Sequence, residues 1–160
     1  MKAVKIETTL EIYNTIKDLP QEIQNLMEAA VKARENAYAP YSNFKVGAAI
    51  LLQNQKVVTG SNQENASYPS GLCAERTAIY YAGAQYPKAK MLKIAVTASS
   101  QNQITDTPIP PCGACRQAIA EYEIKQNHPI EIYFMGVKGK VVKSNSLANL
   151  LPLAFDHSFL

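Results

Sequence analysis

The chain of 160 residues is long enough for one domain with a hydrophobic core of its own, since 47% of its residues are hydrophobic and 18% are charged. Its net charge of +3, without a Lys/Arg block or arginine-rich tail, gives no indication of a nucleic-acid-binding face. No stretch reaches membrane-spanning length, and the first residues lack the apolar run of a signal peptide. Three cysteines are an odd number, which argues against a disulfide framework and favours a reducing, cytoplasmic location.

The first half of the chain predicts an N-terminal extension, a helix and a hairpin. Apolar and polar residues alternate over residues 4–12, which indicates an extra strand or an extended arm within an extension of residues 1–18. Apolar residues recur at helical spacing after Pro20 and predict an amphipathic helix of about four turns. Residues 44–52 and 56–60 indicate a hairpin, whose first strand is apolar almost throughout and is therefore expected to be central.

The second half alternates helices and strands. A polar loop over residues 62–71 leads into the next predicted helix. The elements expected from there are a helix at 74–84, a strand at 91–97, a long loop at 99–111, a helix at 113–125, strands at 130–135 and 138–143, and a closing helix at 144–151 that Asn145 or Ser146 could cap. This order predicts an α/β fold in which a mixed five-stranded sheet is covered by helices on both faces, as a single domain over residues 1–160.

The cysteines carry the strongest functional signal. Cys73 precedes one predicted helix, and Cys112 and Cys115 stand at the start of the next. Helix N-termini favour thiolate over thiol through their free N–H groups and dipole. Residues 112 and 115 are one helical turn apart and face the same way, so one metal ion could contact all three sulfurs. Three protein ligands without a fourth are typical of catalytic zinc, whereas structural zinc has four.

Glu75 and two arginines accompany the cysteines. An acid in a first helical turn ordinarily serves only to complement the helix dipole. Beside an open metal site, however, the Glu75 carboxylate could accept and return a proton. Three thiolates leave a zinc site with net negative charge, and Arg76, one turn after Cys73, could offset it by donating hydrogen bonds to the sulfurs. Arg116 is a second candidate for this role, or it points to solvent.

The Cys-Ala-Glu-Arg and Pro-Cys-Gly-Ala-Cys-Arg-Gln motifs resemble those of the zinc-dependent cytidine deaminase family, in its small three-cysteine form. The resemblance implies that Cys73, Cys112 and Cys115 bind one Zn²⁺ per subunit. It also implies that zinc-bound hydroxide attacks C4 of cytidine or deoxycytidine, while Glu75 carries a proton to N3 and then to the departing amine. Uridine or deoxyuridine and ammonia would result, in pyrimidine salvage.

The resemblance extends to residues that would hold the substrate. The stretch from Asn43 to Ala48 is similar to the family's strand-start motif, which implies that Phe44 packs on the base. The stretch from Asn62 to Tyr68 resembles its ribose-binding loop, which implies that Asn62 and Glu64 hold sugar hydroxyls, although Pro69 stands where many members have glycine. Each of these residues could also be plain core or turn.

The C-terminal stretch from Leu150 to Phe155 is similar to a family motif whose phenylalanine reaches a neighbouring subunit's site in a homotetramer. Phe155 could alternatively close the hydrophobic core beneath the last helix. The substrate contacts implied by the resemblance are, in full, Phe44, Asn62, Glu64, Tyr68, Ala74 and Phe155.

Other functions are compatible with parts of this pattern. A deaminase of the same fold could act on another base or on an aminonucleoside antibiotic, but the sugar loop favours a plain nucleoside. An editing deaminase of RNA or DNA has less support, because the chain lacks a basic extension. A non-enzymatic zinc module would need a fourth ligand. A redox dithiol at Cys112 and Cys115 would leave Cys73 without a partner, so metal binding is favoured.

Overall fold

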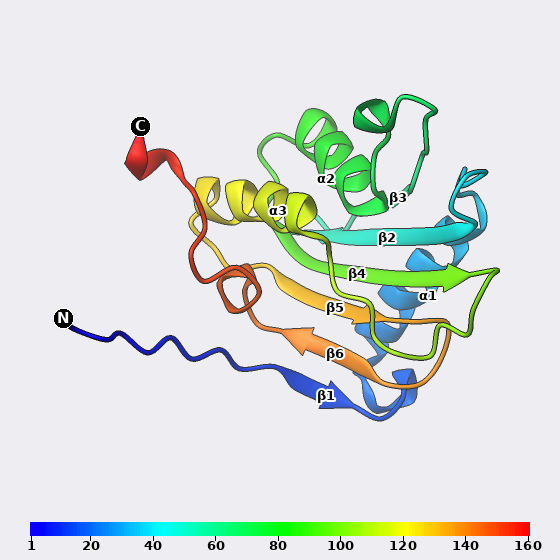
Figure 1. The fold of residues 1–160 in the computed structure, drawn as a ribbon, viewed down its shortest axis with the longest axis horizontal. Coiled ribbons are helices and arrows are strands. Elements are labelled where there is room, and N and C mark those ends of the chain that lie inside the picture. The colour runs from blue at the N-terminus through cyan, green and yellow to red at the C-terminus, as the bar shows by residue number, and fades with distance from the viewer.

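The computed structural model describes all 160 residues and is built on one mixed six-stranded sheet (Figure 1). The strands follow the order β1-β6-β5-β4-β2-β3 across the sheet, and only β4 and β5 pair in parallel. Their bounds are β1 Glu11–Tyr13, β2 Phe44–Leu52, β3 Val57–Ser61, β4 Met91–Ser100, β5 Glu131–Met135 and β6 Val141–Ser144.

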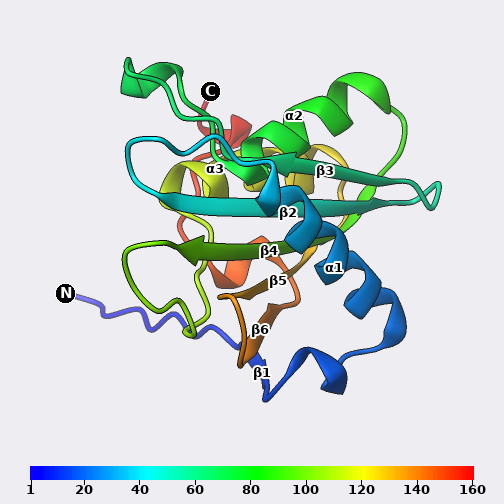
Figure 2. The ribbon, with the colours of Figure 1, turned by 90° about the vertical axis from the view of Figure 1, so that its right-hand side faces the viewer.

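Three α-helices cover the sheet on two faces (Figures 1 and 2). Helix α1 (Gln21–Glu35) packs on one face, and α2 (Ala74–Gln85) and α3 (Gly113–Lys125) pack on the other. The interior strand β2, between β4 and the edge strand β3, contributes Ala48, Ile50 and Leu52 to the core under α2 and α3 and Ala49 and Leu51 to the core under α1, because successive side chains point to opposite faces. The expected two-sided covering of a mixed sheet is confirmed.

The α1 sequence explains its position. Its buried residues recur at intervals of three and four, so they form one apolar stripe toward the sheet. Pro20 stands at the N-cap, where its missing N–H costs nothing, and Lys32 and Arg34 in the last turn complement the dipole. None of the helices has the length and hydrophobicity that crossing a membrane requires.

Gly60 of β3 lets α2 lie directly on the sheet. A Cβ at this position would come within 2.6 Å of both the Ala74 carbonyl oxygen and the Ala78 nitrogen, which are backbone atoms of α2. Only glycine therefore permits this approach. The close contact fixes the first turn of α2, and with it the residue that precedes the helix, Cys73.

The sheet has six strands, where five were expected, because residues 11–13 add β1 to the edge strand β6. The alternating pattern over residues 4–12 left open a strand or an arm, and the structure contains both. Glu11 pairs with Lys143 in the ladder and accepts a hydrogen bond from Asn145 at 2.8 Å. The residues before β1 run on outside the sheet (Figure 1).

The closing α-helix expected over residues 144–151 was wrong. Strand β6 continues to Ser144, and only a short 3₁₀ helix follows at Leu147–Asn149, capped by Ser146, whose Oγ accepts a hydrogen bond from the Ala148 nitrogen. Pro152 disfavours helical backbone at the residue before it. The residues between β6 and this proline are too few to stabilise an α-helix.

Candidate metal centre

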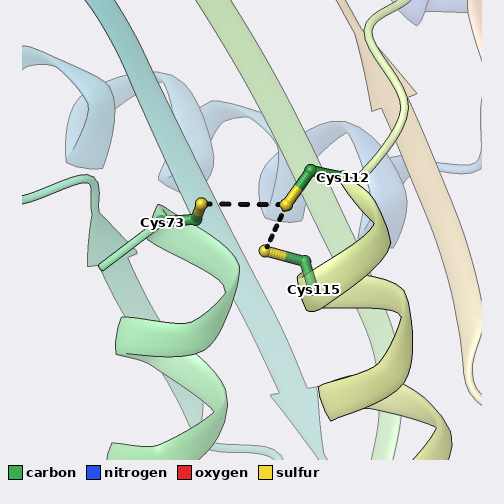
Figure 3. Close-up of side chains that lie close together, drawn as sticks. All are labelled: Cys73, Cys112 and Cys115. Carbon is green, nitrogen blue, oxygen red and sulfur yellow. Dashed lines mark hydrogen bonds between the residues drawn. The ribbon is translucent and has the colours of Figure 1, made fainter. Parts of the chain in front are cut away.

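Three sulfurs converge where α2 and α3 begin (Figure 3). Cys73 is the N-cap of α2, Cys112 is the N-cap of α3, and Cys115 is buried in the first turn of α3. The Cys73 Sγ lies 3.9 Å from the Cys112 Sγ, which lies 3.5 Å from the Cys115 Sγ. All three sulfurs lie within 4.8 Å of one another, so the expected convergence is confirmed.

The spacing of the sulfurs fits zinc. Two thiolates on one tetrahedral zinc, each at about 2.3 Å, lie roughly 3.8 Å apart. The Cys73–Cys112 and Cys112–Cys115 sulfur separations of 3.9 and 3.5 Å bracket this value. The cluster contains no fourth Cys, His, Asp or Glu ligand atom, which leaves one coordination position for water or substrate, as in catalytic zinc sites.

The surroundings of Cys73 favour its thiolate. Its pKa is lowered to about 5, chiefly because the Cys115 thiol donates a hydrogen bond to it and next because Arg76 does so. Burial acts in the opposite direction on Cys73. The Arg76 Nη2 lies 3.7 Å from the Cys73 Sγ, and the pKa of Arg76 is raised by this contact. The site is therefore prepared for a cation before any ion binds.

Glu75 follows Cys73 in the first turn of α2 and is 5% exposed. Its pKa is raised, chiefly because burial disfavours the charged carboxylate and further because of the negative charge of Cys73. A carboxyl group in this position holds a proton more readily than one in water. This is the property required of a group that takes up and returns a proton at neutral pH.

An open cavity of about 450 Å³ lies beside these residues, within the size range of small-molecule sites. Its wall includes Cys73 and Arg76 from the metal site and Asn62, Glu64 and Tyr68 from the predicted sugar loop. The structure thus joins two segments that the sequence had assigned to one site.

Asn62 and Glu64 already hold backbone groups of the strand β2 region. The Asn62 Oδ1 accepts a hydrogen bond from the Val46 nitrogen at 2.7 Å, and its Nδ2 donates to the Phe44 carbonyl at 2.9 Å. The Glu64 carboxylate accepts hydrogen bonds from the Tyr41 nitrogen at 2.9 Å and from the nitrogen and hydroxyl of Ser42. These contacts orient both side chains along the cavity wall.

Tyr68 is 77% exposed and meets Tyr41 edge-on, with ring centroids 6.5 Å apart. Both rings stand at the cavity wall, and Ser42 lies there as well. The sequence reasoning missed Tyr41 and Ser42. Their position directly before the strand-start motif was the one signal that could have indicated them.

Three expected substrate contacts lie outside the cavity wall of the single chain. Phe44 begins β2, Ala74 begins α2 and is fully buried, and Phe155 is 59% exposed and stacks on Phe159 at 5.7 Å. Arg116 was expected either to donate to the cysteine sulfurs or to point to solvent, and neither expectation holds. Its guanidinium donates to the carbonyls of Pro111 at 2.8 Å and Leu150 at 3.0 Å, so it joins the loop before α3 to the C-terminal segment.

Comparison with known proteins identifies the family to which this fold and metal site belong. Residues 20–128 match the family described as "Cytidine and deoxycytidylate deaminase zinc-binding region". The chain belongs to this family. Its members are hydrolases that bind zinc, and the three cysteines described above are placed to hold one ion in each subunit.

Individual proteins similar to this chain are named cytidine deaminases, in agreement with the family match. A cytidine deaminase from Halalkalibacterium halodurans is 42% identical over 132 residues, which are 82% of this chain and 92% of that protein. A cytidine deaminase from Sporosarcina psychrophila is 41% identical over 138 residues, 84% of this chain and 92% of that protein. The crystal structure of cytidine deaminase from Burkholderia pseudomallei superposes with a TM-score of 0.71 at 42% identity, covering 86% of this chain and all of that chain.

Proposed function

We propose that the protein is a zinc-dependent cytidine deaminase that hydrolyses cytidine and deoxycytidine to uridine and deoxyuridine, with release of ammonia. The observation that carries this proposal is the cluster of three thiols at two helix N-termini, with the buried carboxyl group of Glu75 two residues after Cys73 and an open cavity alongside. The family description names cytidine, a ribonucleoside, and deoxycytidylate, a deoxyribonucleotide, so substrates with either sugar occur within the family. Recovery of pyrimidines in a reducing cytoplasm is the role that such a reaction and three free thiols would serve.

Cys73, Cys112 and Cys115 would hold the ion, and bound zinc would supply Lewis acidity that activates water for attack on C4 of the pyrimidine. Glu75 moves the protons. Its carboxylate takes the first proton of the water and delivers it to N3 of the ring, then takes the second proton from the oxygen now bonded to C4 and transfers it to the departing amine. One water is consumed and one ammonia leaves, so Glu75 ends the cycle in its initial state.

Arg76 offsets negative charge at the thiolates. Its contact with the Cys73 Sγ stabilises that thiolate without using a coordination position. The same guanidinium reaches the cavity wall. We assign it a positioning role, because it acts through Cys73 and not on the reacting atoms.

The polar wall of the cavity would bind the sugar. Asn62 and Glu64 each keep unused hydrogen-bonding capacity after their backbone contacts, since amide and carboxylate oxygens accept more than one bond. Donors and acceptors matched to hydroxyls discriminate strongly against a ligand that lacks them. Tyr68 would border the sugar on the solvent side, where it is exposed.

Phe44 and Ala74 would contact the base, and Phe155 would complete the site of a neighbouring subunit in a homotetramer. Phe155 stacks on Phe159, and both rings are exposed together with Leu153 nearby in the chain. This assignment is supported because a cluster of exposed apolar side chains marks a protein–protein contact. Gln117 Nε2 donates to the Phe155 carbonyl at 2.7 Å, which holds the segment against α3.

The test is the loss of cytidine's ultraviolet absorbance on addition of purified protein, with and without a zinc chelator. Deoxycytidine, cytosine and adenosine are assayed alongside. Zinc-dependent loss with the two cytosine nucleosides only is the expected result. Loss that persists after complete zinc removal, or none from zinc-loaded protein with either nucleoside, would overturn the proposal.

A further inference from the structure

Residues 1–10, here called the arm, lead into β1 and project away from the body of the molecule (Figure 1). The apolar residues of its alternating pattern are uncovered. Val4 is 78% exposed, Ile6 is 51% exposed and Leu10 is also exposed. The family match covers residues 20–128 and does not include the arm.

The arm has the backbone of a strand that lacks a partner. None of the backbone–backbone hydrogen bonds involves residues 1–10. Its one backbone contact to the rest of the chain joins the Thr9 nitrogen to the Asn149 Oδ1 at 3.4 Å. An extended segment with free N–H and C=O groups and alternating apolar side chains is a template for pairing with another strand.

The arm joins the body of the molecule at β1, and contacts of β1 hold this end of the arm in place. Strand β1 pairs with β6, and the Glu11 carboxylate contacts the Lys143 Nζ at 3.4 Å and the Asn145 Nδ2 at 2.8 Å. Strand β1 is also the last strand of the sheet, so its outer edge is open. Pairing of the arm would continue an edge that already exists and would lose less chain entropy than ordering a free tail.

We propose that the arm pairs antiparallel with the arm of a second copy of this chain, about a two-fold axis at Ile6. The charges select this partner and this register. Lys5 and Glu7 lie two residues apart and their side chains already form an ion pair on one side of the arm. With Ile6 opposite Ile6 of the partner subunit, Lys5 of each copy faces Glu7 of the partner subunit.

Neighbouring registers are disfavoured. A shift by two residues in one direction brings Lys5 against Lys5 of the partner subunit, and in the other it brings Glu7 against Glu7 of the partner subunit. Like charges directly opposite destabilise a strand pair. A shift by one residue would set the apolar side of one arm against the charged side of the other. A shift by four in one direction would set Lys5 opposite Glu11, whose carboxylate is already bound to Lys143 and Asn145. A shift by four in the other direction would set Lys5 opposite Ala3 and lose the charge pairs.

A disulfide crosslink tests the register. Directly opposite residues in an antiparallel pair have Cα atoms about 4.5–5.5 Å apart, within reach of a disulfide. Two copies of Ile6→Cys should therefore crosslink under a mild thiol oxidant and run as a dimer on a non-reducing gel. Val4→Cys is the matched control, because two copies of position 4 would lie roughly 13 Å apart along the ladder. Wild-type protein reports any crosslinking through the native cysteines.

Charge variants of Ile6→Cys test the partner. Adding Lys5→Glu should lower the crosslinked fraction at least several-fold, and adding Lys5→Glu with Glu7→Lys should restore it. Lys2→Glu, which changes net charge equally but faces no charge in this register, should leave it unchanged. Equal crosslinking at positions 4 and 6, or failure of the double exchange to restore what Lys5→Glu removes, would overturn arm-to-arm pairing in this register.

Discussion

Replacement of Arg76 by glutamine should weaken zinc binding. The guanidinium places Nη2 3.7 Å from the Cys73 Sγ and is the second group, after Cys115, that holds the pKa of this thiol near 5. A hydrogen bond from a charged donor contributes about 1.5–3 kcal/mol, and loss of a contact to a metal ligand typically costs about 10- to 100-fold in affinity. Glutamine removes the charge, and its amide nitrogen lies two bonds closer to the backbone than the guanidinium Nη2 does.

For Arg76→Gln, a loss in the lower part of the range of about 10- to 100-fold in zinc affinity is expected. A distance of 3.7 Å is long even for a sulfur acceptor, and the Arg76 Nε is buried without a partner, so part of its desolvation is not recovered. The Kd for zinc should rise about 10- to 30-fold, which corresponds to about 1.4–2 kcal/mol.

Competition with a fluorescent zinc chelator at fixed pH and salt measures this change. Arg34→Gln is the matched control, because Arg34 lies in α1 on the opposite face of the sheet and bonds Thr97. A Kd of Arg76→Gln within two-fold of wild type, with the fold intact by circular dichroism, would refute the role assigned to Arg76. An equal loss in Arg34→Gln would show that the effect is not local.

Three further predictions follow from packing, titration and exposure. Gly60→Ala should lower the free energy of unfolding, measured in urea, by about 1–3 kcal/mol, because the new Cβ meets the backbone of α2. Gly113→Ala places its Cβ in open space and should leave the free energy of unfolding unchanged, so equal effects of the two changes would contradict the packing argument. Hydrogen bonds, chiefly from Ser42, lower the pKa of Glu64 in the folded protein below its unfolded value of about 4.3. The Glu64 carboxylate therefore stabilises the fold above that pH, and this contribution is lost as the pH falls through the folded pKa. The difference in urea midpoint between wild type and Glu64→Gln should therefore shrink from pH 6 towards pH 3, and a constant difference would argue against it. Phe155→Ala should raise KM for cytidine with little change in Tm, since the side chain is 59% exposed; an insoluble protein with unchanged KM in the soluble part would favour a core-closing role.

Local signals in the sequence were sufficient for the elements that position the site. Helix α3 begins and ends where predicted, because Cys112 can serve as N-cap and the apolar spacing continues to residue 125. The hairpin strands differ from prediction by one residue at most. These elements depend on periodicity and turns within a few residues, which a sequence records directly.

Contacts between distant segments could not be predicted in the same way. The Arg116 contact with the Leu150 carbonyl joins residues 34 positions apart, and nothing near Arg116 in the sequence distinguishes it from a solvent-exposed arginine. The roles of Asn62 and Glu64 in holding the backbone before and within β2 depend likewise on how the loop folds back. The closing helix failed for a different reason: Pro152, a local signal, leaves too few residues after β6 for an α-helix.

The measurement that tests the central claim most directly is turnover and zinc content of Glu75→Gln side by side. Glutamine preserves the size of the buried side chain but cannot carry a proton, so zinc content and Tm should match wild type while kcat for cytidine falls about 10²- to 10⁴-fold. Glu121→Gln, on the exposed side of α3, is the matched control and should retain full activity. A Glu75→Gln variant with bound zinc and a rate within a few-fold of wild type would contradict the account.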